Sequence, residues 1–139
     1  MSLVTVDRGP AVAQAVTVAE QVVNNISVSI IDRPGPVLLL GMFNVTNPAA
    51  QTPTDSLLLA KNGVAIPGAV SSLTHIASDR LQGVVHHFDQ AAVGDVYTLR
   101  ISSTVAGAGH QLEAGQSSLT VIGLDPNAAL SAGISAALA

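Results

Sequence analysis

Histidine is the residue type in this chain with the widest chemistry, because a neutral imidazole can bind a metal ion or take up a proton near neutral pH. Two of the four histidines, His86 and His87, stand side by side in the stretch GVVHHF. Adjacent residues of a strand point to opposite faces of a sheet, so this pair cannot hold one ion from the same face. His75 and His110 fall in predicted loops and show no ligand spacing to a carboxylate or to another histidine. The spacing therefore predicts no metal site.

The other groups that could act in catalysis are serine hydroxyls and aspartate carboxylates. The nucleophile elbow G-x-S-x-G is absent, and the serines of GQSSL precede a strand that we expect to be buried. Asp79, Asp89 and Asp95 stand beside predicted turns, where a carboxylate commonly caps the turn or faces water. Two acids held across a cleft, as glycoside hydrolysis requires, are not predicted. We therefore expect no catalytic residue and no cofactor, and we expect that the chain is not an enzyme.

The composition restricts the partners of the chain. Of its 139 residues, 48% are hydrophobic and only 10% are charged, and the net charge is −4 at pH 7. With so few cations and 2% aromatic residues, the chain offers neither phosphate neutralisation nor base stacking, so we expect no nucleic-acid partner. The absence of cysteine excludes disulfides and thiolate chemistry. No apolar run reaches the roughly 20 residues that span a bilayer, and no basic region precedes the first apolar residues, so we expect neither a membrane segment nor an export signal.

Short strands separated by turns account for most of the sequence. The segment VYTLRISSTV alternates most clearly, with Tyr97, Leu99 and Ile101 opposite polar neighbours. The dipeptide Asn62-Gly63 stands between two apolar runs and predicts a hairpin with a type I′ turn. About eight such strands at this spacing are typical of an all-β, antiparallel sandwich of the jelly-roll class.

Two of the predicted strands are apolar on both faces. Residues 37–45 and 118–124 carry apolar side chains at odd and at even positions, whereas an isolated antiparallel sandwich shows polar residues on its outer faces. Large apolar surfaces commonly mark interfaces, and the simplest cover is another copy of the chain in a closed symmetric assembly. The candidate interface residues are Leu38, Leu40, Met42, Leu119, Val121, Ile122 and Leu124.

The last third of the sequence resembles a known family. Its order of a short strand, GDVYTLRISS, a glycine-containing loop and SSLTVIGL is similar to the trimeric jelly roll shared by tumour necrosis factor, complement heads, spore-surface proteins, and phage fibre-tip and head-decoration proteins. In that family the last strand lies near the threefold axis, which implies that the candidate interface residues of 118–124 divide between the core and a trimer contact. A histidine that meets its symmetry mates on such an axis is an alternative route to a metal site. Scarce aromatic residues and the lack of a collagen-like repeat favour the phage branch.

These observations divide the chain into an N-terminal arm over residues 1–21, a jelly-roll domain over residues 22–124 and an alanine-rich tail over residues 125–139. Apolar arms can add a strand to an exposed sheet edge, so we expect the arm to contact a partner. The candidate residues for this contact are Leu3, Val4, Val6, Val12 and Val16.

The resemblance implies a structural virion protein. The expected function is that of a homotrimeric capsid decoration protein, which binds the major capsid protein on the outer surface of a phage head and stabilises it. The alternative is the receptor- or glycan-binding head of a phage fibre or of a spore-surface protein. In that alternative the loops at residues 47–55 and 106–115 form the recognition surface.

Overall fold

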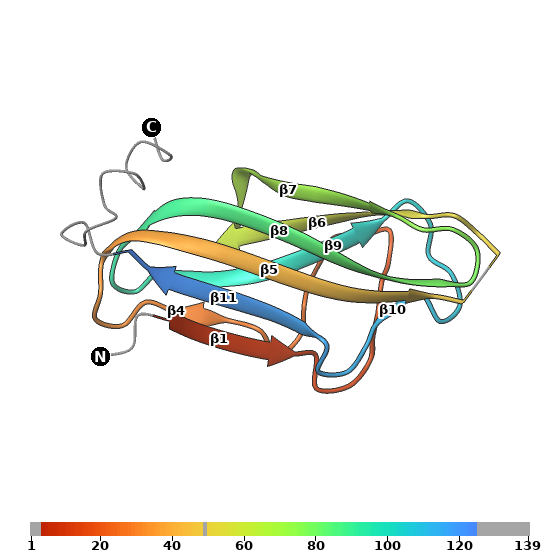
Figure 1. The fold of residues 1–139 in the computed structure, drawn as a ribbon, viewed down its shortest axis with the longest axis horizontal. Helices are drawn as coiled ribbons and strands as arrows, with labels where there is room; N and C mark the ends of the chain where they lie inside the picture. The colour runs from red at the N-terminus through yellow and green to blue at the C-terminus, as the bar shows by residue number, and fades with distance from the viewer. Residues whose placement is uncertain (1–3, 49, 125–139) are drawn as a thin grey trace.

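The computed structural model describes residues 4–48 and 50–124 (Figure 1). These residues form eleven β-strands in two antiparallel sheets. No helix occurs in this part of the chain, and so none of it could cross a membrane as a helix. The strands are β1 (Val4–Gly9), β2 (Gln14–Ala15), β3 (Gln21–Val22), β4 (Val28–Ser29), β5 (Gly35–Asn47), β6 (Thr54–Lys61), β7 (Val64–Thr74), β8 (Asp79–Ala91), β9 (Val96–Ser103), β10 (Gln111–Leu112) and β11 (Ser117–Gly123).

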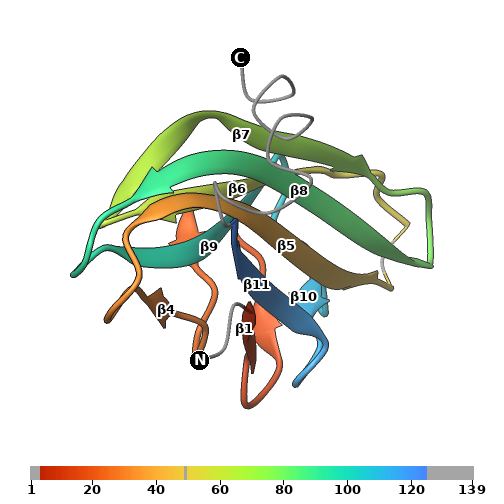
Figure 2. The same ribbon diagram turned by 60° about the vertical axis from the view of Figure 1, so that its left-hand side comes forward.

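The order of the strands defines a jelly-roll sandwich. In the first sheet β5 pairs with β8 on one side and with β11 and β10 on the other, and β1 and β2 lie beyond these two strands. In the second sheet β6 lies between β7 and β9, and β3 and β4 both pair with β9. Figure 2 shows the β8–β5–β11–β1 layer in front of β6 and β9. The chain passes repeatedly from one sheet to the other, and this arrangement confirms the predicted fold class.

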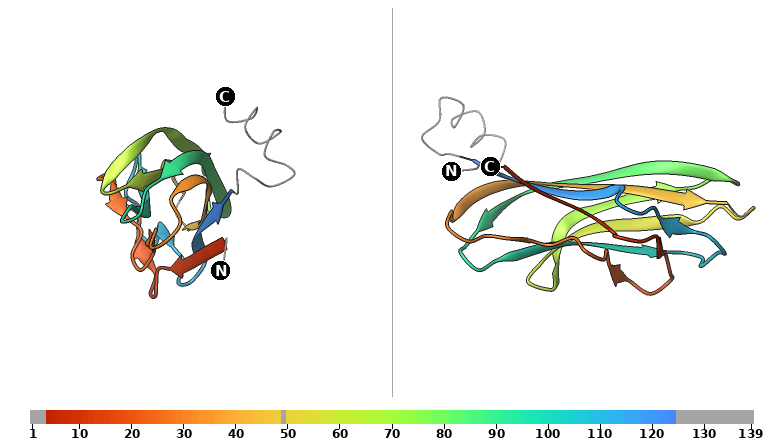
Figure 3. Two further views of the ribbon diagram at one scale, coloured as in Figure 1. Left: turned by 90° about the vertical axis from the view of Figure 1, so that its left-hand side faces the viewer. Right: turned by 90° about the horizontal axis from the view of Figure 1, so that it is seen from below.

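The core lies between the sheets and is built mainly by alternation. Burial alternates along β5 and β9, whereas four consecutive residues of β6, Leu57 to Ala60, are buried next to a register shift in its pairing with β7. Figure 3 shows the two layers end-on and from below. Each fully buried Leu, Ile, Val or Phe contributes roughly 1.5–3 kcal/mol relative to an exposed position. The fully buried members include Leu39, Phe43, Val45, Leu57, Leu59, Tyr97, Leu99 and Ile101.

The turn between β6 and β7 has the predicted chemistry. Asn62 has φ of 53° and Gly63 has φ of 80°, and a type I′ turn requires positive φ at both central residues. Asparagine and glycine adopt this conformation at low cost. The Asn-Gly hairpin is therefore confirmed.

The N-terminal segment belongs to the sandwich and does not form a separate arm. β1 pairs with β11 from Val4 opposite Ile122 to Gly9 opposite Ser117, and β2 and β3 pair with β10 and β9. Val16 is 1% exposed and belongs to the core. The physical reason is that the edges of β11, β10 and β9 offer free backbone groups, which these short strands satisfy. Leu3 and the predicted tail over residues 125–139 lie outside the described residues.

The two sheets approach each other closely at Gly41 of β5. A Cβ atom added there would lie 2.7 Å from Leu99 Cδ2 and 3.0 Å from Val85 Cγ1. Leu99 is fully buried, so its side chain cannot move away into solvent. Glycine at this position lets a large side chain of the opposite sheet fill the space over β5.

Replacing Gly41 by alanine is therefore expected to destabilise the fold by about 1–3 kcal/mol, because the added methyl group overpacks the core. Urea denaturation would measure the change as a lower midpoint with an unchanged slope. The matched control is Gln82→Ala, an exposed position of the same sheet, which should change stability by no more than about 0.5 kcal/mol. Equal effects of the two substitutions would contradict this account of the packing.

Candidate functional site

The outer face of the β8–β5–β11–β1 sheet carries apolar side chains on all four strands, with polar residues such as Thr120 and His86 between them. Residues paired directly across neighbouring strands share one face, and the register sets Leu38 of β5 between Ile122 of β11 and Phe88 of β8. Met42 is 36% exposed and its partner Val84 on β8 is 48% exposed. We call this surface the outer apolar face; its apolar members are Val4, Val6, Leu38, Leu40, Met42, Val84, Phe88 and Ile122.

The predicted interface residues divide between this face and the core. Leu38, Leu40, Met42 and Ile122 lie on the outer apolar face. Leu119 and Val121 are buried, because they pair with the inward positions Gly41 and Leu39 of β5. These two side chains are therefore not available to a second chain. Leu124 follows β11, and its backbone N–H donates to the carbonyl of Pro36 over 2.9 Å.

The residues predicted to contact a capsid also differ in position. Val4 and Val6 of β1 are half-exposed and belong to the outer apolar face. Val12 lies in the connection between β1 and β2 and is 73% exposed. Val16 packs in the core and cannot contact a partner. The N-terminal segment thus keeps exposed apolar residues, but on a structured surface.

The adjacent histidines of β8 point to opposite faces, as predicted. His86 pairs with Leu40 and is exposed on the outer face. His87 pairs with the inward position Leu39 and is partly buried. The two rings therefore cannot hold one ion within a single chain.

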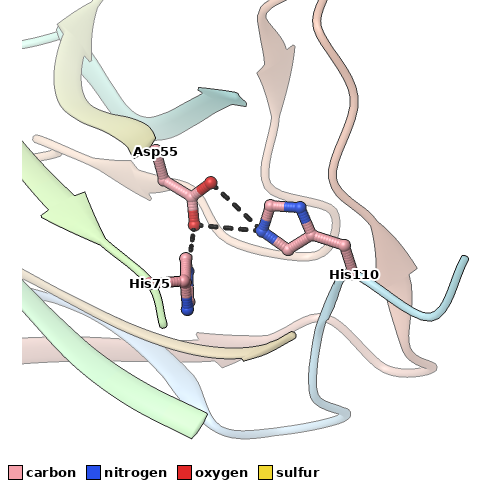
Figure 4. Close-up of side chains that lie close together, drawn as sticks. All are labelled: Asp55, His75 and His110. Carbon is pink, nitrogen blue, oxygen red and sulfur yellow. Dashed lines mark hydrogen bonds and ion pairs between the residues drawn. The ribbon is translucent and has the colours of Figure 1, made fainter. Parts of the chain in front are cut away.

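The other two histidines meet a carboxylate in the interior, which their spacing along the sequence did not indicate. Asp55 lies near the start of β6, His75 follows β7 directly, and His110 precedes β10 (Figure 4). Asp55 Oδ2 lies 2.7 Å from His75 Nε2, and Asp55 Oδ1 lies 3.1 Å from His110 Nε2. None of the three residues is more than 1% exposed. We call this group the Asp55 cluster.

A second carboxylate extends the Asp55 cluster. His75 Nδ1 lies 2.7 Å from Asp79 Oδ1, so the ring stands between two carboxylates. Asp79 Oδ2 accepts a hydrogen bond from the backbone N–H of Ile76 over 2.8 Å, which fixes the orientation of the carboxylate. The backbone N–H of His75 donates to Pro53, and that of His110 donates to Gly107. These bonds fix the backbone at both histidines.

Alternation along the strands gave one signal for this cluster. Asp55 is in phase with the inward residues Leu57 and Leu59, and His110 stands two residues before the buried Leu112. This parity places each polar side chain on the inner side of its element. The meeting of residues 55, 75 and 110 depends on three separate connections, which the spacing along the chain does not encode.

The Asp55 cluster offers a donor set but no reaction site. One nitrogen of each ring and one carboxylate oxygen lie within 4.8 Å of one another, which is a range in which a single metal ion could contact all three. Because the three side chains are buried, a substrate in solution cannot reach them. The Asp55 cluster can bind an ion or a proton. It can also join the three segments of the chain that carry its side chains.

Of the remaining predicted carboxylates, Asp95 caps a turn at the other end of the sandwich, whereas Asp89 lies within β8 and not beside a turn. Asp95 accepts a hydrogen bond from the backbone N–H of Ala92 and another from the side-chain amide of Asn62, both over 2.8 Å. These bonds, the backbone one first, lower the pKa of Asp95. Asp89 accepts a hydrogen bond from the Tyr97 hydroxyl over 2.7 Å. Burial, together with the charge of Asp89, raises the pKa of Tyr97, so this hydroxyl remains a donor.

Comparison with known proteins identifies the fold. Neither a family model nor a curated protein matches the sequence. Among solved structures, the Eiger TNF of S. frugiperda matches with a TM-score of 0.54 and 12% identity, over 88% of this chain and 92% of that one. The fold is a TNF-like jelly roll. Rabbit GITRL also matches, with a TM-score of 0.48 and 16% identity, over 84% of this chain and 79% of that one.

Removal of the shared acceptor should test the Asp55 cluster. Asp55→Ala leaves two buried imidazole nitrogens without their carboxylate, and we expect the free energy of unfolding to fall by about 3–5 kcal/mol. Urea denaturation would measure the loss. The control is Asp32→Ala in an exposed turn, with an expected change within about 0.5 kcal/mol. A small loss for Asp55→Ala would show that the cluster does not support the fold.

Replacement of Asp95 by asparagine should reduce stability only at pH values where the wild-type carboxylate is ionised. Folding lowers the pKa of Asp95 below its ordinary value of 3.8. The resulting stabilisation is fully present above that value, and it is lost as the pH falls through the folded-state pKa. The Tm difference between wild type and Asp95→Asn should therefore be present near neutral pH and shrink on acidification. A difference that grows as the pH falls would contradict this assignment.

Proposed function

We propose that the chain is a structural virion protein, a homotrimeric decoration protein that binds the outer surface of a phage head and stabilises it. The observation that carries the proposal is the outer apolar face. Eight apolar side chains lie on one side of four neighbouring strands, on the surface of a chain with only 10% charged residues. An apolar surface of this kind favours association over contact with water.

A second copy of the chain is the proposed cover for this face. Interfaces between permanent subunits are more hydrophobic than other surfaces and resemble a core cut in half. β5 fits that description, because its inward side fills the core and its outward side carries Leu38, Leu40 and Met42. We propose three copies of the chain because the fold resembles trimeric jelly rolls. A closed ring of three chains leaves no apolar face open to the addition of further chains.

Stabilisation of a capsid follows from mass action. A protein that binds only the assembled shell lowers the free energy of that shell by its binding free energy. A trimer presents each contact three times, so weak contacts add up to strong attachment. Within residues 4–21, Val12 and Val18 are the most exposed large apolar residues, and we place the capsid contact there.

The oligomeric state is the first test. Size exclusion with light scattering should give wild type a mass of three times 14.0 kDa. Leu40→Glu places a charge in the middle of the outer apolar face and should give a monomer, because burial of an unpaired charge is costly. The control is Val64→Glu on β7 of the other sheet, where the side chain is 68% exposed, and it should remain trimeric. A wild-type monomer, or a trimeric Leu40→Glu variant, would contradict the proposed interface.

Capsid binding is the second test. The wild-type chain should cosediment with shells assembled from the major capsid protein of the same virus and should raise their melting temperature. The Val64→Glu variant should bind as wild type does, whereas Leu40→Glu should lose the multivalent attachment. A chain that stays in the supernatant would exclude the decoration function. Binding to a glycan array instead would favour a receptor-binding head.

A further inference from the structure

We infer that Asp55, His75 and His110 bind one divalent transition-metal ion, zinc by preference, which joins the two sheets at one end of the sandwich. This site is independent of the outer apolar face and of the proposed capsid contact. The inference starts from the chemistry of the donors. Two imidazoles and one carboxylate are a ligand set that zinc takes in proteins, whereas calcium and magnesium prefer oxygen ligands alone.

The distances in the Asp55 cluster suit a bound ion after a small expansion. Zinc holds nitrogen and oxygen ligands at about 2.0–2.2 Å, so neighbouring ligands of a tetrahedral ion lie about 3.3 Å apart. His110 Nε2 lies 3.1 Å from Asp55 Oδ1 and 3.2 Å from Asp55 Oδ2. His75 Nε2 lies 2.7 Å from Asp55 Oδ2, so this contact must open, and all three donors lie within 4.8 Å of one another. Both carboxylate oxygens face the rings, so Asp55 can supply two of four positions.

The charges of the Asp55 cluster favour a dication. Two carboxylates, Asp55 and Asp79, contact the same buried imidazole ring. Buried charges require compensation, since transfer of an unpaired carboxylate from water is costly. One divalent ion would offset the two negative charges of Asp55 and Asp79.

One unsatisfied atom supports the same assignment. Asp55 Oδ1 is a buried oxygen without a hydrogen bond within the described residues, and it lies 3.1 Å from His110 Nε2. A metal ion would bind this oxygen directly. His75 then binds through Nε2 and donates its Nδ1–H to Asp79, which is the carboxylate–histidine–zinc arrangement that fixes the ring and raises its basicity.

The position of the site gives the ion a structural role. Asp55 belongs to β6 of the second sheet, His75 to the connection from β7 to β8, and His110 to the loop before β10 of the first sheet. These segments meet at one end of the sandwich, where the chain crosses between the layers. Figure 4 shows the three side chains pointing toward one another. An ion held there would join elements that are 20 and 55 residues apart in sequence, as the contacts of Asp55 show.

Zinc and cobalt binding by the full chain tests the inference. After treatment with a chelator and dialysis, the wild-type chain should take up one Zn²⁺ per chain by equilibrium dialysis, and added Zn²⁺ should raise its Tm. One equivalent of Co²⁺ should give the visible absorption of a tetrahedral nitrogen- and oxygen-ligated ion. Absence of uptake at a tenfold excess of Zn²⁺ would overturn the inference.

Substitutions locate the ion. His110→Gln should abolish stoichiometric uptake, and Asp79→Asn should weaken zinc affinity by about 10–100-fold through its effect on His75. The matched control is His86→Gln, which removes an exposed histidine and should leave the stoichiometry at one. Undiminished binding by a folded His110→Gln variant would overturn the assignment. Loss of binding in His86→Gln would also overturn it.

A measurement on the wild-type chain covers the case in which His110→Gln does not fold. In the Co²⁺-loaded protein, NMR should show strongly shifted ring protons for the two histidines of the Asp55 cluster. The rings of His86 and His87 should keep their positions. Strong shifts at His86 or His87 alone would mean that the ion binds on β8, and the Asp55 cluster would then be held by protons.

Discussion

Apolar contact between the inner faces of the two sheets determines where every other feature of the molecule lies. The chain has almost no aromatic residues, so leucine, valine and isoleucine fill the core, and the sheets must approach closely to leave no voids. Gly41 shows how close this approach is, because the fully buried Leu99 occupies the space that a side chain would take. Once the inner face of each strand is defined by this packing, pleating assigns the alternate residues to the outside.

The outer apolar face is a direct consequence of that alternation. In most antiparallel sandwiches the alternate positions are polar, but β5 carries leucine and methionine at those positions, and its neighbours add isoleucine, phenylalanine and valine. One strand therefore packs into the core with one side and presents an apolar surface with the other. In the proposed trimer, the outward side chains of β5 pack against another copy of the chain, as its inward side chains pack in the core.

The Asp55 cluster is the exception to the apolar interior. Asp55 stands in line with the inward leucines of β6, at the end of the sandwich where the chain crosses between the sheets. A buried carboxylate there needs compensating groups, and two histidines from other segments surround it. The proposed zinc ion would complete this compensation, and it would hold together the three segments that meet there.

The sequence by itself determined the all-β class and the Asn62-Gly63 hairpin. It also determined the clear strand at residues 96–103 and the apolar character of residues 37–45 on both faces. These features could be predicted because strand alternation and turn chemistry are local properties. The sequence did not determine that residues 4–21 pair with β11, β10 and β9, nor that Leu119 and Val121 turn inward, because both depend on which strands become neighbours. The same reason applies to Asp55, His75 and His110. The local sequence around each of these residues does not indicate a site, and only the long-range pairing of the sheets brings their side chains into contact.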